Sequence, residues 1–216
     1  MVSSDRRGNG IKTLSPPEAW NYIDSVLHFF GKRVLDIGVG QGESMRHMMK
    51  LGAKVTGLDK DPGAVQTLRD VTLGDVTSIP YSANSFDLVT AFETLHDVSQ
   101  HKDAIKEMKR VGRIVAVEEP PTDPEQIRFL ELDRKHGLGE DLRPGSCWAD
   151  LLGPSVKRYP YIRRARLPTD VRPILEMYVK RFNGSLEEYL EAWDRAYGDK
   201  EWIDQVCCLF VVEGKN

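Results

Sequence analysis

The 216-residue sequence has few cysteines and no apolar run long enough to cross a membrane, which takes about 20 residues. Three cysteines, two of them adjacent at Cys207 and Cys208, cannot form a disulfide framework. In a strand this pair points to opposite faces, so we expect core packing rather than metal or redox chemistry. No signal-peptide pattern is visible near Met1. These absences predict a cytoplasmic protein with no membrane partner and no metal site.

The sequence also lacks an excess of charge of one sign and contains no repeats. Its net charge is −3 and its pI about 6.0, which argues against a nucleic-acid substrate. Hydrophobic content of 40% and charged content of 29% are ordinary for a globular protein, and the length suits a single α/β domain over residues 1–216. The sequence does not indicate an oligomeric state.

One segment departs from this balance. Residues 157–166 carry five cationic side chains interleaved with two tyrosines. Such a segment could contact RNA phosphates and stack on bases. The same pattern is typical of an edge strand whose arginines keep other strands away, and this is the interpretation that we favour.

The most informative segment is Val34–Gly42, which reads Val-Leu-Asp-Ile-Gly-Val-Gly-Gln-Gly. An apolar strand runs directly into three glycines, where the backbone can turn sharply and approach a ligand. The next segment, Glu43–Lys50, is predicted to be a helix with Met45, Met48 and Met49 on one face. Strand, glycine turn and helix together indicate a nucleotide-type site at the helix N-terminus.

The spacing of the glycines argues against a dinucleotide. A dinucleotide fingerprint is G-x-G-x-x-G, but here the third glycine comes one residue early, at Gly42, and Glu43 would repel a pyrophosphate. Asp36, inside the strand, could hold a ligand's ammonium group directly or through water. The expected ligand is therefore a nucleoside that bears an amino acid.

Four motifs in succession carry a family resemblance. They are the glycine segment, a second strand Lys54–Asp59, the Leu73–Val76 segment, and a fourth strand Ser85–Phe92 with the turn Glu93–Asp97. In this order they resemble class I S-adenosylmethionine-dependent methyltransferases, of the type 11-like small-molecule group. A fifth strand fits Arg113–Glu119, and the match covers roughly residues 16–120.

The resemblance implies S-adenosyl-L-methionine as cofactor and S-adenosyl-L-homocysteine as product, and it assigns the cofactor site. Asp59, 17 positions after Gly42, would hold the ribose hydroxyls, and Asp75 would accept from the adenine amino group beside the Val76 amide. The full expected set of cofactor-binding residues is Asp36, Gly38, Gly40, Gly42, Asp59, Lys60, Asp75, Val76 and Phe92.

Methyl transfer needs little chemical help from the protein, because the cofactor's sulfonium already activates the methyl group. The main task of the protein is then to align the acceptor with that methyl group. A general base is needed where the acceptor holds its proton tightly. His96 is the candidate base, although it could equally cap or pack the following helix, and Glu93 is an acidic neighbour that could orient it or bind a cationic acceptor. The family often has a second His where this sequence has Asp97, so a role for that pair is not carried over.

The predicted fold is a Rossmann-like, mostly parallel sheet of seven strands with helices on both faces. A strand Tyr159–Leu167 and a last strand Val206–Glu213 should form an antiparallel pair at or near the sheet edge. Helix starts are predicted at Ser15-Pro16, running to about Phe30, and at Asp61-Pro62, Asp123-Pro124 and Ser185, and the pattern of apolar residues predicts another helix over 171–182.

The 37-residue connection 168–204 is long for a compact domain, and such connections are usually functional. We expect helices over 171–182 and 185–197 and a short helical piece around Trp202. The aromatic residues of this insertion suit simple packing, but they could also line a pocket. We interpret the insertion as a possible lid that selects the substrate.

Three functional hypotheses remain at this stage. The favoured one is methyl transfer to a small-molecule acceptor. RNA or protein methylation is an alternative, with RNA contacting residues 157–166. The third is a catalytically silent member of the fold that binds the cofactor or serves as a scaffold.

Overall fold

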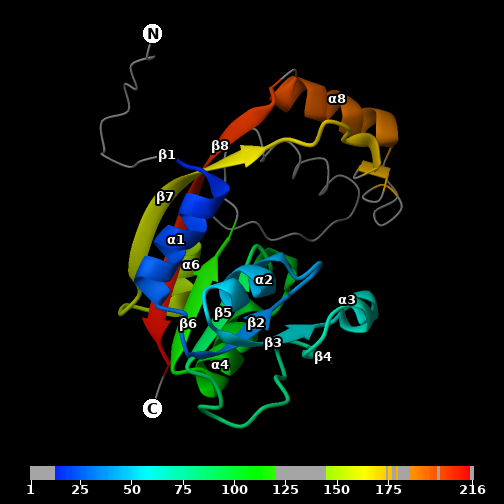
Figure 1. Ribbon diagram of the computed structural model, residues 1–216. Helices are drawn as coiled ribbons and strands as arrows, with labels where there is room; N and C mark the ends of the chain where they lie inside the picture. The colour runs from blue at the N-terminus through cyan, green and yellow to red at the C-terminus, as the bar shows by residue number, and fades with distance from the viewer. Residues whose placement is uncertain are drawn as a thin grey trace.

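The computed structural model describes residues 13–119, 145–173, 185–198 and 200–214, together with 175, 176 and 179. Within them one sheet of eight strands runs in the order β1-β7-β8-β6-β5-β2-β3-β4 (Figure 1). The strands are β1 Thr13–Leu14, β2 Arg33–Ile37, β3 Lys54–Asp59, β4 Val71–Leu73, β5 Leu88–Phe92, β6 Ile114–Glu118, β7 Lys157–Arg166 and β8 Trp202–Glu213. The helices are α1 Pro16–Leu27, α2 Glu43–Lys50, α3 Pro62–Thr67, η1 Leu95–Asp97, α4 His101–Val111, α6 Gly145–Leu152 and α8 Leu186–Tyr197.

The sheet confirms the predicted fold class. Every paired strand is parallel to its neighbour except β8, which runs antiparallel to both β6 and β7. The strand count differs by one from the prediction, because the two-residue strand β1 covers part of β7 at the sheet edge. Two residues are too few to show an alternating pattern in a sequence.

Helices cover both faces of the sheet, as predicted. On one face α1, α2 and α3 pack on a core that includes Val34, Leu88 and Cys207. On the other, α4 and α6 pack on a second core that includes Leu35, Val89 and Phe210. Neighbouring residues of one strand thus enter opposite cores, as the period of two in a strand requires. Cys207 and Cys208 behave in the same way and are both free.

The helix starts follow local sequence chemistry. Ser15 and Glu18 form a capping box at the start of α1, and the Asp61 side chain accepts a hydrogen bond from the Gly63 amide at the start of α3. Helix α1 ends at Leu27, before the expected Phe30. The Asp123-Pro124 start lies outside the described residues, as does much of the helix expected over 171–182, of which 172, 173, 175, 176 and 179 are helical.

Two predicted details, one of packing and one of secondary structure, are wrong. Met45 and Met48 are buried, but Met49 is 51% exposed, because it falls on the solvent side of α2. The short helical piece expected around Trp202 is instead the beginning of β8, which starts four residues earlier than predicted. Each residue of 202–205 pairs with a residue of β7, from Trp202 with Arg166 to Gln205 with Arg163, so strand pairing overrides the local pattern there.

The β7–β8 pair extends beyond the sheet as a two-stranded ribbon that leads to α8 (Figure 1). We call residues 164–204 of this extension the arm. The arm has a small apolar cluster of its own, formed by Leu167, Trp193, Tyr197 and Ile203. Since β7 is parallel to the main strands, the chain leaves it at their carboxyl ends, as expected for the insertion. Among the described residues, no helix is long and apolar enough to span a membrane.

Candidate functional site

The glycine loop between β2 and α2 has the conformation that its sequence predicts. Gly38, Gly40 and Gly42 have φ angles of 70°, 48° and 75°, which residues with a side chain rarely adopt. A Cβ on Gly38 would lie 2.1 Å from Thr94 Cγ2, whereas a Cβ on Gly40 would meet nothing within 4 Å. Gly38 is therefore required by packing, and Gly40 lies beside open space in which a ligand can approach the backbone.

Asp59, at the carboxyl end of β3, is tied to this loop. Its Oδ2 accepts a hydrogen bond from the Gly40 amide at 2.9 Å, and its Oδ1 accepts one from the Asp61 amide at 2.8 Å. The residue is only 9% exposed. A carboxylate offers about four acceptor positions, so both oxygens can also accept from a ligand diol. The predicted ribose contact fits this arrangement.

Asp36 lies deeper, below the loop, and is 1% exposed. Its Oδ2 accepts from the Ser44 hydroxyl at 2.5 Å, and its Oδ1 accepts from the Thr90 hydroxyl at 2.8 Å. Burial raises the pKa of Asp36 to about 6, although both hydroxyl bonds oppose the shift. With so little exposure, contact with a ligand ammonium group through water or the loop suits the geometry better than direct contact.

Of the remaining residues around the loop, Gly42 packs against other protein residues, whereas Lys60 and Glu43 are exposed to solvent. A Cβ on Gly42 would lie 2.9 Å from the Leu68 side chain and 3.2 Å from Arg46, so this glycine faces protein. Lys60 is exposed directly after Asp59. The side chain of Glu43, at the start of α2, is 80% exposed. The expectation that Gly42 and Lys60 bind the cofactor remains a prediction.

Asp75 and Val76 follow β4 on a turn at the same edge of the sheet. The Oδ1 atom of Asp75 accepts from the amide and the hydroxyl of Thr77, at 2.7 and 2.6 Å. These hydrogen bonds lower the pKa of Asp75. Val76 is buried, whereas Asp75 is exposed, so the turn presents the carboxylate outward with a fixed orientation. This position suits the predicted contact with an adenine amino group.

An aromatic group lies at the end of β5. Phe92 packs edge-on against Trp20 of α1, with ring centroids 5.2 Å apart, and Trp20 stacks on His47 of α2 at 4.8 Å. Burial lowers the pKa of His47. Helix α1 therefore covers one flank of the loop, and Trp20 and His47 join Phe92 in forming an apolar wall there.

His96 is held firmly by Glu119, directly after β6. The Glu119 carboxylate accepts from the amides of Thr94 at 3.1 Å, Leu95 at 2.7 Å and His96 at 3.3 Å. The same carboxylate contacts His96 Nδ1 at 2.8 Å. Since Glu119 acts as the acceptor throughout, Nδ1 carries the proton of the neutral ring and Nε2 carries the lone pair. Nε2 lies 3.9 Å from Asp97 Oδ1.

Glu93 lies on the other side of this turn. Its carboxylate forms an ion pair with Arg163 of β7, which also lies 3.5 Å from Glu118 Oε1. Glu118 is 1% exposed and accepts from the Tyr161 hydroxyl. Burial raises the pKa of Glu118, while Arg163 and Tyr161 oppose the shift. The two adjacent acids Glu118 and Glu119 thus face opposite sides of the sheet, one toward β7 and one toward η1.

Sequence reasoning missed Glu118, Glu119 and Arg163 as site residues. A signal for the first two was present, because consecutive acids at the end of a buried strand are costly unless each has a partner. The sequence indicates Arg163 only as one member of the cationic segment 157–166. Its position opposite Glu93 depends on the alignment of β7 with β5 through two intervening strands, which no local pattern shows.

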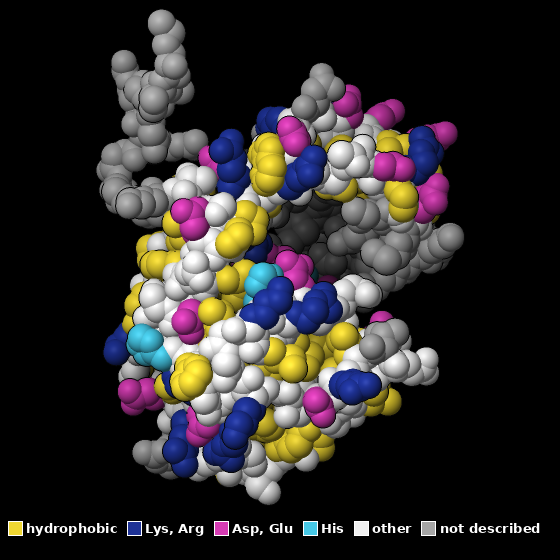
Figure 2. All heavy atoms as spheres, viewed as in Figure 1, with side chains coloured by type: hydrophobic (Ala, Val, Ile, Leu, Met, Phe, Trp, Pro, Cys, Tyr) yellow, Lys and Arg dark blue, Asp and Glu magenta, His cyan; other side chains and the backbone are white. Residues whose placement is uncertain are grey.

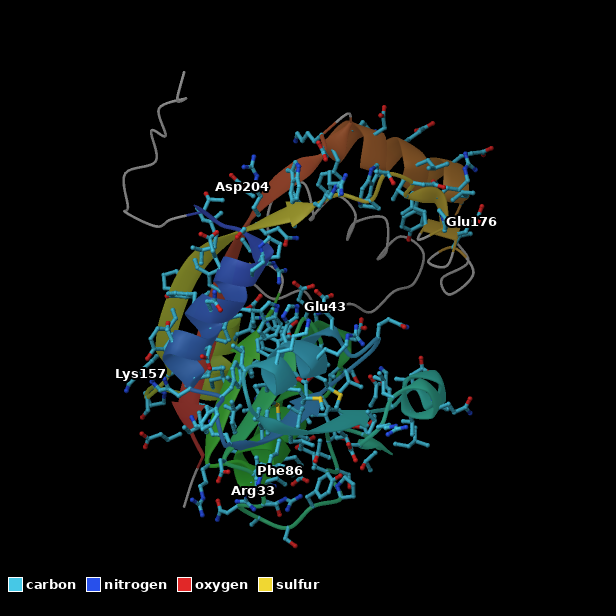
Figure 3. All side chains as sticks on the ribbon, in the orientation of Figure 1. Arg33, Glu43, Phe86, Lys157, Glu176 and Asp204 are labelled. Atoms are coloured by element: carbon cyan, nitrogen blue, oxygen red, sulfur yellow. The ribbon has the colours of Figure 1, made fainter. Side chains whose placement is uncertain are left out.

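A hollow separates the arm from the body of the molecule (Figure 2). Glu43, at the start of α2, faces it from the body, while Asp204 and Glu176 lie on the side of the arm (Figure 3). A different depression of about 410 Å³ includes Arg33 and Phe86 and lies at the other end of the strands, away from the loop (Figure 3). No group of His, Cys, Asp and Glu within the described part of the chain is arranged to hold a metal ion.

The family described as "Methyltransferase domain" matches residues 35–114. A demethylmenaquinone methyltransferase of Renibacterium salmoninarum is 32% identical over 122 residues, 51% of this chain and 52% of that protein. A ubiquinone biosynthesis O-methyltransferase of Marinobacter nauticus is 27% identical over 177 residues, 74% of this chain and 73% of that protein. The chain thus spans about half the length of the first of these relatives.

A solved structure from Bacillus halodurans, itself proposed to be a methyltransferase, shares the fold. Its TM-score is 0.65 at 14% identity, and the match covers 91% of this chain and 99% of that chain. The matched segment 35–114 contains the glycine loop, Asp59, Asp75 and the turn that carries His96.

Proposed function

We propose that the chain is a class I S-adenosylmethionine-dependent methyltransferase and that it transfers the methyl group of S-adenosyl-L-methionine to a hydroxyl group of a small molecule; the matched family segment, the similar methyltransferases and the shared fold support this. When bound, the cofactor supplies an activated methyl group on a sulfonium. The protein's own residues bind the cofactor, orient the acceptor and take up its proton.

The observation that carries the proposal is the contact between the glycine loop and the turn that holds His96. The Thr94 hydroxyl lies 3.2 Å from the Ile37 carbonyl and 3.4 Å from that of Gly38, while its backbone amide donates to Glu119. One residue thus joins the proposed cofactor loop to the turn that carries the candidate base. Cofactor and base approach the acceptor from adjacent strands, β2 and β5.

His96 is the proposed general base. A neutral imidazole with its proton fixed on Nδ1 by Glu119 presents the Nε2 lone pair to an acceptor hydroxyl. Glu119 acts through His96 and is a positioning residue: it sets the tautomer and fixes the turn through three backbone amides. The carboxylate also stabilises the imidazolium that forms when the ring accepts the proton.

The acceptor class is inferred from the names of the relatives and from the aromatic residues near the site. One named relative is a demethylmenaquinone methyltransferase, and the relative with the longer match is a ubiquinone biosynthesis O-methyltransferase; the first supports a small-molecule acceptor and the second an acceptor oxygen. The aromatic wall of Trp20 and Phe92 suits an acceptor with a planar apolar part.

RNA as acceptor has less support. Arg163 is engaged by Glu93, and Arg164 and Arg166 lie over the Trp202 ring, with Asp204 and Glu201 as their respective acidic partners. The charges of residues 163–166 are therefore largely compensated within the protein. A phosphate backbone would have to displace these partners to bind there.

The test uses cofactor labelled on its methyl group and fractionated cell extract as the source of acceptor. We expect label in a low-mass fraction that organic solvent extracts. The variant His96→Gln should abolish this incorporation while leaving the affinity for S-adenosylhomocysteine unchanged in calorimetry. His28→Gln is the matched control, because that histidine is exposed at the end of α1, outside the residues assigned to the site.

Label in RNA or protein would contradict the small-molecule proposal. A complete lack of transfer, combined with tight cofactor binding, would favour a silent scaffold instead. Full activity of His96→Gln would show that His96 is not the general base and would point to an acceptor that is already deprotonated.

A further inference from the structure

The turn after β5 contains a residue in an unfavourable backbone conformation. Glu93 has a φ of 50°, in the left-handed region that residues with a Cβ rarely occupy. Such a residue keeps this conformation only where its surroundings hold it. Glu93 directly precedes Thr94, Leu95 and His96, whose amides bind Glu119, so its geometry sets where His96 lies.

Two contacts hold Glu93. Its amide donates to the Glu118 carbonyl at 2.7 Å, which continues the β5–β6 pairing, and its carboxylate pairs with the Arg163 guanidinium. The first contact fixes the backbone. The second fixes the side chain, and it comes from β7, three places away from β5 in the sheet.

Arg163 is itself positioned by several acceptors. Its Nε and Nη2 atoms lie 3.2 and 3.0 Å from Gln205 Oε1, and its Nη1 lies 3.5 Å from Glu118 Oε1. Its side chain is only 27% exposed. Burial works to lower the pKa of Arg163, but Glu93 and Glu118 outweigh it and raise the pKa, so the cation is permanent.

Gln205 also pairs with Arg163 across the β7–β8 ribbon, at the point where the ribbon leaves the sheet. The arm begins at the next residue of the ribbon. Within it, Arg164 and Arg166 lie over Trp202, 5.9 and 5.8 Å from the ring centroid. Arg163 thus lies directly between the arm and the carboxylate of Glu93.

We propose that Arg163 is a positioning residue that couples the arm to the turn carrying His96, so that the position of the arm sets the alignment of the base. This inference rests on the proposed function for the role of His96. The physical linkage from Gln205 through Arg163 to Glu93 can be tested without any acceptor.

The test compares Arg163→Met with Arg158→Met by hydrogen exchange of the segment 90–99, with and without S-adenosylhomocysteine. Arg158 lies on the same strand, outside the arm, and is exposed. We expect exchange of the Thr94–His96 amides to rise about fivefold to tenfold in Arg163→Met and less than twofold in Arg158→Met. The remaining amides should exchange as in the wild type.

A double mutant distinguishes coupling from general destabilisation. If Arg163 acts through Glu93, then Glu93→Gln combined with Arg163→Met should raise exchange no further than Arg163→Met alone. Arg163→Lys keeps the charge but loses the fork of donors, and it should restore part of the protection. In the labelled-methyl assay, Arg163→Met should reduce incorporation at least tenfold while leaving the affinity for S-adenosylhomocysteine within twofold.

Equal exchange of the Thr94–His96 amides in the two single mutants would overturn the proposal, as would additive effects of the Glu93 and Arg163 changes. If Arg163→Met unfolds the protein, Arg163→Lys and Glu93→Gln decide the same question, because each weakens the pair from one side. Failure of the wild type to transfer methyl groups would count against the proposed function alone, since the exchange experiments still report on the linkage.

Discussion

At the scale of single residues, two aspartates at the carboxyl ends of neighbouring strands have different roles. Asp59 accepts from backbone amides of the loop and of the α3 start, so it faces the segments that we expect to surround the cofactor. Asp36 accepts from two hydroxyl groups in the interior and is almost fully buried. We therefore expect the first to bind the cofactor and the second to shape the loop from below.

The role of Asp59 predicts a specific loss of affinity. Asp59→Ala removes a charge-assisted acceptor for the ribose hydroxyls and should weaken binding of S-adenosylhomocysteine by about 1.5–3 kcal/mol in calorimetry. Asp61→Ala is the control, because that carboxylate caps α3 only two residues away. It should cost about 1 kcal/mol of stability with no change in affinity. Unchanged affinity in Asp59→Ala would remove Asp59 from the site, and tight NAD binding by the wild type would contradict the assigned cofactor.

The burial of Asp36 predicts a pH-dependent stability. Its pKa is about 6 in the folded protein against an ordinary value of 3.8. The folded state therefore binds the proton more tightly, and this contribution to stability is present at low pH and is lost as the pH rises through 6. Asp36→Asn should accordingly stabilise the protein without ligand at pH 8, by at most about 3 kcal/mol, and by about half as much at pH 5. Thermal unfolding at the two pH values measures the difference.

Asp87 provides a control of opposite sign. Hydrogen bonds from Arg33 lower the pKa of Asp87, so its contribution is present at neutral pH and is lost on acidification. Asp87→Asn should therefore destabilise the protein at pH 8, where Asp36→Asn stabilises it. If both variants shift stability in the same direction, burial does not govern the titration of Asp36.

At the scale of elements, comparing Gly40 of the glycine loop with Gly31, which precedes β2, distinguishes the effect of backbone strain from the effect of ligand access. Gly31 and Gly40 both have positive φ angles, 76° and 48°, and open space where a Cβ would be. Substituting alanine at either should cost about 1–2 kcal/mol of stability in denaturant unfolding. Only Gly40→Ala should also weaken binding of S-adenosylhomocysteine. Equal cofactor affinity in the two variants would place the ligand away from Gly40.

Gly38→Ala should behave differently from both. Its Cβ would lie 2.1 Å from Thr94 Cγ2, so either the loop or the turn that carries His96 must move. We expect a larger loss of stability than in Gly40→Ala, together with loss of cofactor binding, measured by the same two methods. A Gly38→Ala variant as stable as Gly40→Ala would show that the contact between loop and turn is loose.

The elements that sequence alone predicted are those with strong local signals. The helix Glu43–Lys50 and the strand Lys54–Asp59 match the structure at both ends, because a glycine turn or an acid marks where each begins or stops. The beginning of β8 at Trp202 was not predictable, since its strand conformation comes from pairing with β7. The same holds for the site: the family resemblance implies the role predicted for Asp59, but the contact between His96 and Glu119 joins two residues 23 positions apart in sequence, which no local pattern shows.

At the scale of the whole molecule, the described residues form two large cores on the faces of the sheet and a small one in the arm. Within the described ranges, the loop and the His96 turn contact the sheet, the helices that cover it and residues next to these elements, such as Glu119 after β6. The described members of the arm cluster, Leu167, Trp193, Tyr197 and Ile203, all belong to the extension. Tyr189 is 1% exposed, so this aromatic residue packs and does not line a pocket.

This division predicts that the arm can be removed without unfolding the domain. The ribbon remains paired up to Arg166 and Trp202, and the Leu167 amide donates to the Glu201 carbonyl at 2.9 Å. Replacing residues 169–200 by Asn-Gly leaves a three-residue loop, Pro168-Asn-Gly, between Leu167 and Glu201, so it shortens the arm and leaves β8 complete. We expect the shortened protein to bind S-adenosylhomocysteine with an affinity within about twofold of the wild type, since the loop, Asp59 and Asp75 are untouched. Transfer of labelled methyl groups should be lost, because the acceptor is no longer enclosed from the side of the arm. A shortened protein that unfolds would make residues 169–200 ordinary core, and one that still methylates at the wild-type rate would show that the arm is not a lid.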